Sequence, residues 1–231
     1  MRIQKYCSEN GICSRREAED YIKRGLIKVN GKVVRELGTQ IDPLKDKIQL
    51  IAARTNASNS QKMTVLCYKP RGYTCSKSRT EGPSVFSLFP EWAHLNTVGR
   101  LDKASEGLLL LSNDGRITKV VTGIDHKIEK EYEVDVREEV TKDKLRLFDI
   151  GVMIDDIKTL PAKTKFLGPH RFIIILREGR KHQIRRMTDV VQWTVTKLKR
   201  VRIGPFTTRG LEPGMGRVLN EKEVAMIIKS K

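Results

Sequence analysis

The chain has 231 residues, with 45 Lys or Arg against 28 Asp or Glu, and so a formal net charge of +17 at pH 7. A hydrophobic content of 39% excludes a disordered basic tail, and the length allows either one large domain or a medium domain with a small one. Such a positive surplus predicts a polyanionic partner, with nucleic acid ahead of an anionic membrane. No apolar run approaches the roughly 20 residues of a membrane span, and residues 1–5 lack an apolar signal region, so a cytoplasmic protein is expected.

Residues 1–51 are expected to fold as a small unit. Ser14-Arg15-Arg16-Glu17 is a capping-box sequence, which predicts a helix that begins here and ends at Gly25. Asn30-Gly31 is the preferred two-residue turn of a β-hairpin, and short apolar stretches flank it within residues 27–34. The pattern is therefore helix followed by hairpin.

Arg15 and Arg16 stand in the first turn of that helix, where the helix dipole disfavours cations. Ion pairs with Glu19 and Asp20 are the alternative, but the order with the basic residue first is the weaker one. A contact with RNA phosphates explains the two arginines better. The other residues of this unit expected to bind RNA are Lys23, Arg24 and Lys28.

This succession of S-R-R, a helix ending at glycine and V-N-G resembles the S4 RNA-binding domain. The resemblance implies binding to structured RNA through its backbone and shape. Residues 52–62 are small and polar and are expected to form a flexible linker. Residues 63–231 are then a second, larger domain.

The second domain mixes strands and helices without regular βαβ alternation. The fold class expected for the whole chain is therefore α+β, with a mixed, largely antiparallel sheet flanked by helices in the second domain. The patterns predict strands at 63–68, 108–111, 130–136, 172–176 and 198–203, helices at 116–121, 141–150 and 180–191, and a last helix capped by Asn220.

One loop of this domain carries a candidate reactive group. Gly99-Arg100-Leu101-Asp102-Lys103 places a carboxylate between two cations, and four consecutive leucines follow at 108–111. A charged loop that leads into a buried strand is a common way to mount a reactive side chain on a rigid scaffold. The alternative is that Asp102 forms a surface ion pair with Arg100 or Lys103.

Two further features accompany that loop. Tyr132 lies on the apolar face of strand 130–136, where an ordinary core aromatic is the alternative. Residues 177–209 carry ten Lys or Arg against two acids, a density that marks a phosphate-binding face. His182 has no second ligand at metal-site spacing and the four cysteines do not match zinc spacings, so no metal site is predicted.

The motifs G-R-L-D before the leucines, K-E-Y at 130–132 and E-G-R-K-H-Q-I-R-R-M at 178–187, behind an S4 domain, resemble one enzyme family. It is the group of pseudouridine synthases that comprises type A for small ribosomal subunits and types B, E and F for large ones, and the F type looks closest. The resemblance implies an isomerase without a cofactor. Such an enzyme cuts the N1–C1′ bond of a uridine in RNA, turns the uracil and joins C5 to C1′.

By motif position, the resemblance makes Asp102 the essential carboxylate, either as a nucleophile or as the base that removes the C2′ proton. Tyr132 would stack on the target base, which must be flipped out of the RNA. Arg185 would pair with Asp102 and keep it ionised. The residues of this domain expected to bind RNA are Lys69, Arg100, Arg180, Lys181, Gln183, Arg186 and Arg200.

The expected substrate is large-subunit (23S) ribosomal RNA, with a tRNA as a further candidate, and the expected protein is a monomer. Two alternatives stay open at this point. One is a non-catalytic S4-containing RNA-binding or ribosome-assembly protein. The other is a synthase of the same family that acts on small-subunit rRNA or on tRNA. A metal-dependent nuclease is weaker still, because no metal-ligand spacing is present.

Overall fold

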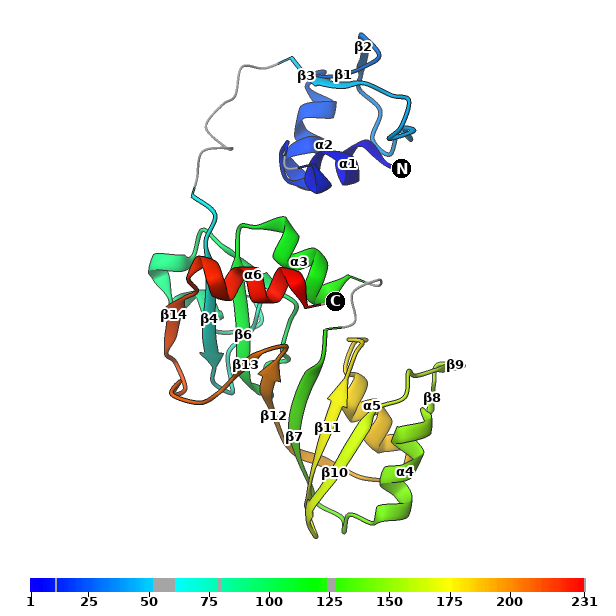
Figure 1. Cartoon of the computed structure of the whole chain (residues 1–231), viewed down its shortest axis with the longest axis vertical. Coiled ribbons are helices and arrows are strands. Elements are labelled where there is room, and N and C mark those ends of the chain that lie inside the picture. Colours follow the sequence, from blue (N-terminus) through cyan, green and yellow to red (C-terminus); the bar gives the residue numbers. More distant parts are fainter. Residues whose placement is uncertain (11, 52–60, 79, 124–127, 231) are drawn as a thin grey trace. The chain divides into compact units, whose positions relative to one another are not determined.

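The computed structural model describes residues 1–10, 12–51, 61–78, 80–123 and 128–230. The chain divides into two compact units, Met1–Lys62 and Met63–Lys231 (Figure 1). Residues 52–60 of the predicted linker lie outside the described residues. None of the helices in the described part is long and apolar enough to cross a membrane.

The N-terminal unit combines two helices with a small sheet. Its elements are α1 (Ile3–Glu9), α2 (Arg15–Lys23), β1 (Ile27–Val29), β2 (Lys32–Val34) and β3 (Ile48–Leu50), with the strand order β2-β1-β3. The predicted capping box is confirmed, because the Glu17 backbone N–H donates to Ser14 Oγ (3.2 Å) and the Ser14 N–H donates to Glu17 Oε2 (2.7 Å). The hairpin turn is also confirmed, with Asn30 and Gly31 at φ 51° and 81°.

The C-terminal unit is built on a nine-stranded sheet. Its main order is β10-β11-β7-β12-β6-β4-β14, with β5 beside β6 and β13 beside β12. Only β6 and β12 pair in parallel among the named strands that the structure describes. The strands are β4 (Thr64–Lys69), β5 (Asn96–Val98), β6 (Glu106–Ser112), β7 (Lys130–Val136), β10 (Lys163–Gly168), β11 (Arg171–Leu176), β12 (Val195–Ile203), β13 (Phe206–Thr207) and β14 (Gly216–Val218).

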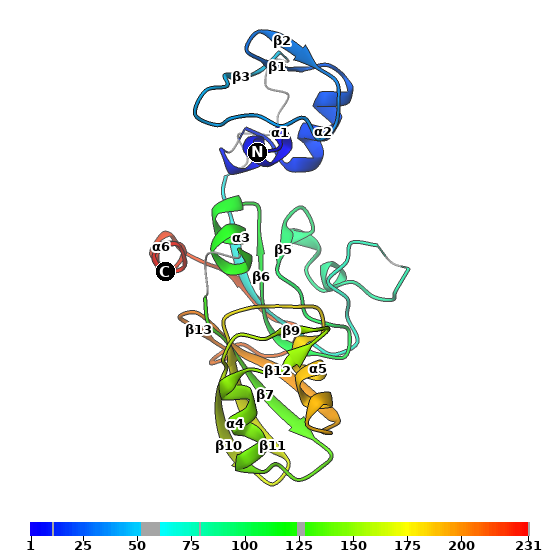
Figure 2. The same cartoon turned by 90° about the vertical axis from the view of Figure 1, so that its right-hand side faces the viewer.

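Helices cover this sheet in two groups (Figures 1 and 2). The helices α3 (Gly115–Thr122) and α6 (Glu221–Lys229) pack together, and both contribute to one apolar cluster. The helices α4 (Lys142–Ile150) and α5 (Gln183–Val190) contribute to a second cluster, which contains Tyr132. A short hairpin, β8 (Met153–Ile154) with β9 (Ile157–Lys158), contacts α5.

The four leucines of β6 are buried because both faces of this strand are covered. Leu108 and Leu110 belong to the cluster of α3 and α6. Leu109 and Leu111 belong to a third cluster, formed with the segment between β4 and β5. Successive side chains of a strand point to opposite faces, so a run without alternation indicates burial on both sides. The α+β fold class and the buried strand are thus as predicted.

The structure also departs from the predicted elements. The helix expected from Arg180 begins at Gln183, because His182 adopts a left-handed conformation (φ 53°, ψ 29°) that interrupts it. Thr141 precedes α4 without a side-chain capping bond. The strand β10 was not predicted, because its largely exposed residues lack an apolar alternation that a sequence pattern can detect.

Gly107 allows an unusually close approach between β6 and β12. It has φ +110° and is paired with Arg200, and a Cβ at Gly107 would lie 2.2 Å from the Arg200 carbonyl oxygen. No side chain fits that gap, and the atom in the way is backbone. Glycine is therefore required for the parallel pairing that joins the two halves of the sheet.

We predict that Gly107→Ala destabilises the protein by on the order of 4 kcal/mol, because it adds a backbone clash to an unfavourable φ. Gly214→Ala is the matched control: its φ is +84°, but a Cβ there meets no atom within 4 Å. Gly214→Ala should lower the free energy of unfolding by only about 1–2 kcal/mol, because it adds the unfavourable φ without a clash. Urea unfolding measures both, and equal losses would contradict the role assigned to the close approach.

Candidate active site

Asp102 lies in the loop that connects β5 to β6. The Ser105 N–H donates to the Asp102 carbonyl (3.0 Å), and the Gly72 N–H donates to the Lys103 carbonyl (2.8 Å). Leu101 is buried in the same apolar cluster as Tyr132. The Asp102 side chain is 36% exposed, so a fixed backbone presents a carboxylate that a substrate can reach.

Lys69 stabilises this loop by hydrogen bonds inside the protein and is not an RNA contact. Its side chain is fully buried, with 0% exposure. Its Nζ donates to the carbonyls of Pro70 (2.9 Å), Tyr73 (2.8 Å) and Ser105 (2.6 Å). Burial lowers the pKa of Lys69 to about 8, while the Asp102 carboxylate acts in the opposite direction. The prediction that Lys69 contacts RNA is therefore wrong, because no phosphate can reach this ammonium group.

Tyr132 on β7 and Arg200 on β12 are partners in the pairing of these two strands, and both are buried. Arg200 Nε donates to the Leu108 carbonyl (2.7 Å), and its guanidinium carbon lies 6.0 Å from the centre of the Tyr132 ring. With an exposure of 3%, Arg200 cannot bind the RNA backbone as predicted. It fixes Tyr132 against β6 instead.

The turn before α5 is held by residues that were also predicted to bind RNA. Gln183 is buried; its amide donates to Glu178 Oε1 (2.6 Å), and its oxygen accepts from the Arg180 N–H (3.0 Å). The Arg180 guanidinium donates to Glu178 (3.2 Å) and to the carbonyls of Ile157 (3.0 Å) and Lys158 (2.7 Å). Gln183 is thus buried among contacts within the protein, whereas the partly exposed Arg180 makes such contacts and its predicted RNA contact stays a prediction.

The remaining predicted RNA contacts of this unit lie nearer the surface. Arg100 and Lys181 are exposed. Arg186 is partly exposed and pairs with Asp155 of the turn between β8 and β9. Lys103 has a structural contact, since its Nζ donates to the Glu81 carbonyl (2.9 Å) and ties the Asp102 loop to the segment between β4 and β5.

Arg185 does not pair with Asp102 as predicted. Its Nη1 donates to the Val195 carbonyl at 3.3 Å. Asp102 Oδ2 instead lies 3.3 Å from Nδ1 of His182. Within the described residues this is the one ion pair or hydrogen bond of the Asp102 side chain. The alternative of a surface pair with Arg100 or Lys103 is therefore not found either.

His182 is the site residue that the sequence interpretation missed. It was considered only as a metal ligand, and within the described residues no three His, Cys, Asp or Glu side chains gather as a metal site would require. The sequence offered no signal for this contact, because His182 precedes α5 in a left-handed conformation and Asp102 lies 80 positions earlier in the chain.

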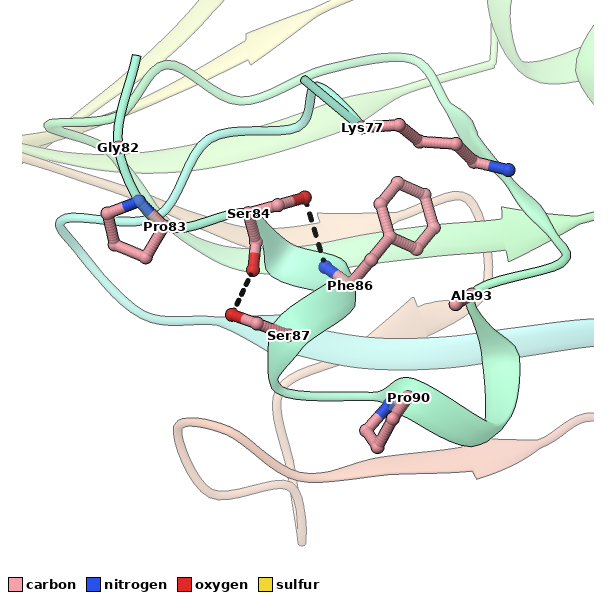
Figure 3. Close-up of a pocket in the computed structure, with 8 residues that line it drawn as sticks. All are labelled: Lys77, Gly82, Pro83, Ser84, Phe86, Ser87, Pro90 and Ala93. Carbon is pink, nitrogen blue, oxygen red and sulfur yellow. Dashed lines mark hydrogen bonds between the residues drawn. The ribbon is translucent and has the colours of Figure 1, made fainter. Parts of the chain in front are cut away.

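A hollow of about 740 Å³ lies in the segment between β4 and β5 (Figure 3). The Phe86 N–H donates to Ser84 Oγ (3.3 Å) and Ser87 Oγ donates to the Ser84 carbonyl (2.7 Å), which shapes its wall. It contains none of the expected catalytic residues and is lined by Lys77, Gly82, Pro83, Ser84, Phe86, Ser87, Pro90 and Ala93. The hollow borders the Lys103 contact and is separate from the Asp102 carboxylate.

The N-terminal unit presents its arginines to solvent. Arg15 and Arg16 are exposed, and neither forms an ion pair with Glu19 or Asp20 within the described residues. Arg24 pairs with Asp20 at 3.3 Å instead. The remaining predicted cations of this unit are exposed (Lys23) or half-buried (Lys28).

Comparison with known families accounts for both units. Residues 63–189 match the family of RNA pseudouridylate synthases, and residues 1–48 match the S4 domain. The chain belongs to the RNA pseudouridylate synthase family. It is therefore an RNA pseudouridine synthase, an isomerase, with an S4 domain for RNA binding. The enzyme class expected from the motifs is confirmed, and the non-catalytic alternative is set aside.

Relatives of two types resemble this pseudouridine synthase about equally. It is 35% identical to the ribosomal large subunit pseudouridine synthase B of Bacillus subtilis (strain 168), over 96% of this chain and 93% of that protein. It is 34% identical to the dual-specificity RNA pseudouridine synthase RluF of Escherichia coli (strain K12), over 99% and 79%. A crystal structure of a pseudouridylate synthase matches 98% of the chain with a TM-score of 0.73 and 27% identity, and 99% of that chain is covered.

We predict that Lys69→Met destabilises this synthase by about 2–4 kcal/mol and lowers its activity, because the buried carbonyls of Pro70, Tyr73 and Ser105 lose their donor. Lys130→Met is the matched control. Burial also lowers the pKa of Lys130 to about 8, but among the described residues its Nζ donates to one carbonyl, that of Ile128, at 3.3 Å.

The control should change stability by no more than about 1 kcal/mol, since relief of a buried charge offsets one long hydrogen bond. Urea unfolding at pH 7, where both ammonium groups are charged, makes the comparison. A Lys69→Met variant as stable and active as Lys130→Met would show that the three carbonyl contacts are dispensable.

Proposed function

We propose that this pseudouridine synthase modifies a uridine of large-subunit (23S) ribosomal RNA, with Asp102 as its catalytic carboxylate. One observation supports the catalytic assignment most strongly. Asp102 is partly exposed on a loop whose neighbour Leu101 belongs to the same apolar cluster as Tyr132, which supports assigning the carboxylate and the aromatic ring to one site. The large-subunit substrate is supported by the name of the Bacillus subtilis relative.

The proposed reaction conserves all atoms. The target uridine is flipped out of the RNA and its uracil stacks on Tyr132. Asp102 either bonds to C1′ or removes the C2′ proton, and the N1–C1′ bond breaks. The uracil then turns, C5 bonds to C1′, the C5 proton leaves, and N1 ends with a proton. Asp102 is regenerated as a carboxylate in either route, because C5 displaces it from C1′ in the first and it returns its proton to C2′ in the second.

Cations of both units would hold the RNA. In the catalytic unit we assign phosphate contacts to Arg100 and Lys181, which are exposed and lie close in sequence to Asp102 and His182. Arg185 is the nearby cation of α5, and its 3.3 Å bond to the Val195 carbonyl is long enough to be exchanged when RNA enters. In the S4 domain Arg15 and Arg16 are exposed and form no ion pair with another residue that the structure describes.

We predict that Asp102→Asn lowers the rate of pseudouridine formation in unmodified ribosomal RNA by on the order of 10³-fold or more, because the amide can neither attack nor accept a proton. Asp143→Asn is the control, since this aspartate lies exposed on α4 and pairs only with Arg146. Mapping pseudouridine at nucleotide resolution in large-subunit RNA, small-subunit RNA and tRNA gives both the rate and the substrate.

Wild-type activity in Asp102→Asn would remove the catalytic assignment. Pseudouridine in tRNA or small-subunit RNA alone would keep Asp102 but overturn the large-subunit substrate. The control should map to the same uridine as the wild type, at the same rate.

We predict that the double variant Arg15→Ala, Arg16→Ala binds RNA more weakly and reduces the slope of log affinity against log salt by about 1–2, one step for each lost phosphate contact. Lys5→Ala with Lys45→Ala removes the same charge from residues already paired with Glu9 and Asp42, and should leave the slope almost unchanged. Filter binding across a series of salt concentrations measures this slope. The same slope in both double variants would show that Arg15 and Arg16 do not contact RNA phosphates.

A further inference from the structure

His182 occupies a left-handed backbone conformation, at φ 53° and ψ 29°, directly before α5. A residue other than glycine is uncommon in this region, and residues held there cluster at functional sites. Glycine would make the same turn with less strain. The presence of an imidazole at this position therefore calls for an explanation other than the turn.

Helix capping is not that reason. The His182 side chain makes no capping hydrogen bond to α5. The turn is already held by Gln183, whose side-chain oxygen accepts from the Arg180 N–H at 3.0 Å. A metal is not the reason either, because no cluster of three ligating side chains exists among the residues described.

What the imidazole does contact is the proposed catalytic carboxylate. Nδ1 of His182 lies 3.3 Å from Oδ2 of Asp102, and the two side chains are 45% and 36% exposed. The terminal torsion of an aspartate is soft, so a carboxylate with no partner rotates freely. An imidazole nitrogen 3.3 Å from Oδ2 restrains that rotation, and Oδ1 has no ion pair or hydrogen bond among the described residues. Because the pair is exposed to water, it adds little to folding.

We propose that His182 is a positioning residue of the synthase, which holds Asp102 through Oδ2 so that Oδ1 meets the flipped nucleotide. The proposal rests on the catalytic role proposed for Asp102. Arg185 does not take this place in the structure, because its guanidinium is bound to the Val195 carbonyl. His182 orients the carboxylate and does not itself touch the reacting atoms.

Three substitutions separate the side chain from the backbone. His182→Gly removes the imidazole and relieves the left-handed strain. His182→Asn also suits this conformation, and its Nδ2 stands where Nδ1 stands in histidine, one bond beyond Cγ, so it can donate to Oδ2. His182→Gln places its amide one carbon further out. Asp156→Gly is the control, a left-handed residue (φ 58°) in the turn between β8 and β9, outside the site.

The experiment measures kcat, KM and RNA affinity on unmodified large-subunit rRNA, with the thermal midpoint of each full-length variant. His182→Gly should lower kcat by about 10- to 100-fold, because the carboxylate is misoriented. KM and RNA affinity should stay within about twofold, because no uniform binding contact is lost. Its midpoint should rise by about 2–4 °C as strain is relieved. A slower enzyme that is also more stable cannot be explained by damage to the fold.

His182→Asn should recover most of kcat and His182→Gln less, while Asp156→Gly should gain stability at unchanged kcat. The proposal is overturned if His182→Gly keeps the wild-type kcat, or if His182→Asn is no faster than His182→Gly. Asp102→Asn is assayed in parallel. Activity in Asp102→Asn would overturn the catalytic assignment itself, whereas an inactive Asp102→Asn beside a fully active His182→Gly would overturn only the role of His182.

Discussion

The parallel pairing of β6 with β12 is the constraint on which the catalytic unit depends. The Asp102 loop leads into β6, α5 leads towards β12, and Tyr132 lies on β7, the next strand beyond β12. These parts are brought to one place only because Gly107 lets β6 approach the backbone of Arg200. The other pairs of named strands that the structure describes are antiparallel, whereas this one is parallel and joins Lys199 to Glu106 and Arg200 to Gly107.

Buried cations stabilise this junction, although the chain as a whole is strongly basic. Lys69 satisfies three carbonyls around the Asp102 loop, and Arg200 satisfies the Leu108 carbonyl beneath Tyr132. Such contacts suit irregular backbone that has no partner in a sheet, because a buried carbonyl without a donor is costly. The positive charge of this protein therefore has two uses. Some of it holds the site together, and only the exposed part, including Arg15, Arg16, Arg100 and Lys181, is available to RNA.

The site is also arranged so that its contacts with Asp102 are weak enough to change. The neighbouring backbone is fixed, but the carboxylate is partly exposed and lies 3.3 Å from a single imidazole nitrogen. A rigid loop with an accessible side chain limits the cost of ordering when the nucleotide enters, and it leaves room for Arg185 to approach. In the same way, the S4 domain presents arginines that no acidic neighbour occupies, so their full charge can meet phosphate.

The sequence by itself determined the α+β class, the capping box of α2, the Asn30-Gly31 turn, the buried strand of leucines and the enzyme family. These are local patterns or ordered motifs, and each is set by residues close together in the chain. Only the tertiary structure decided which cations are buried. Lys69 and Arg200 look like RNA contacts in a basic sequence, but they bind the carbonyls of Ser105 and Leu108, which lie 36 and 92 positions away. The same holds for His182, whose contact with Asp102 spans 80 positions and depends on a left-handed turn that helix periodicity does not predict.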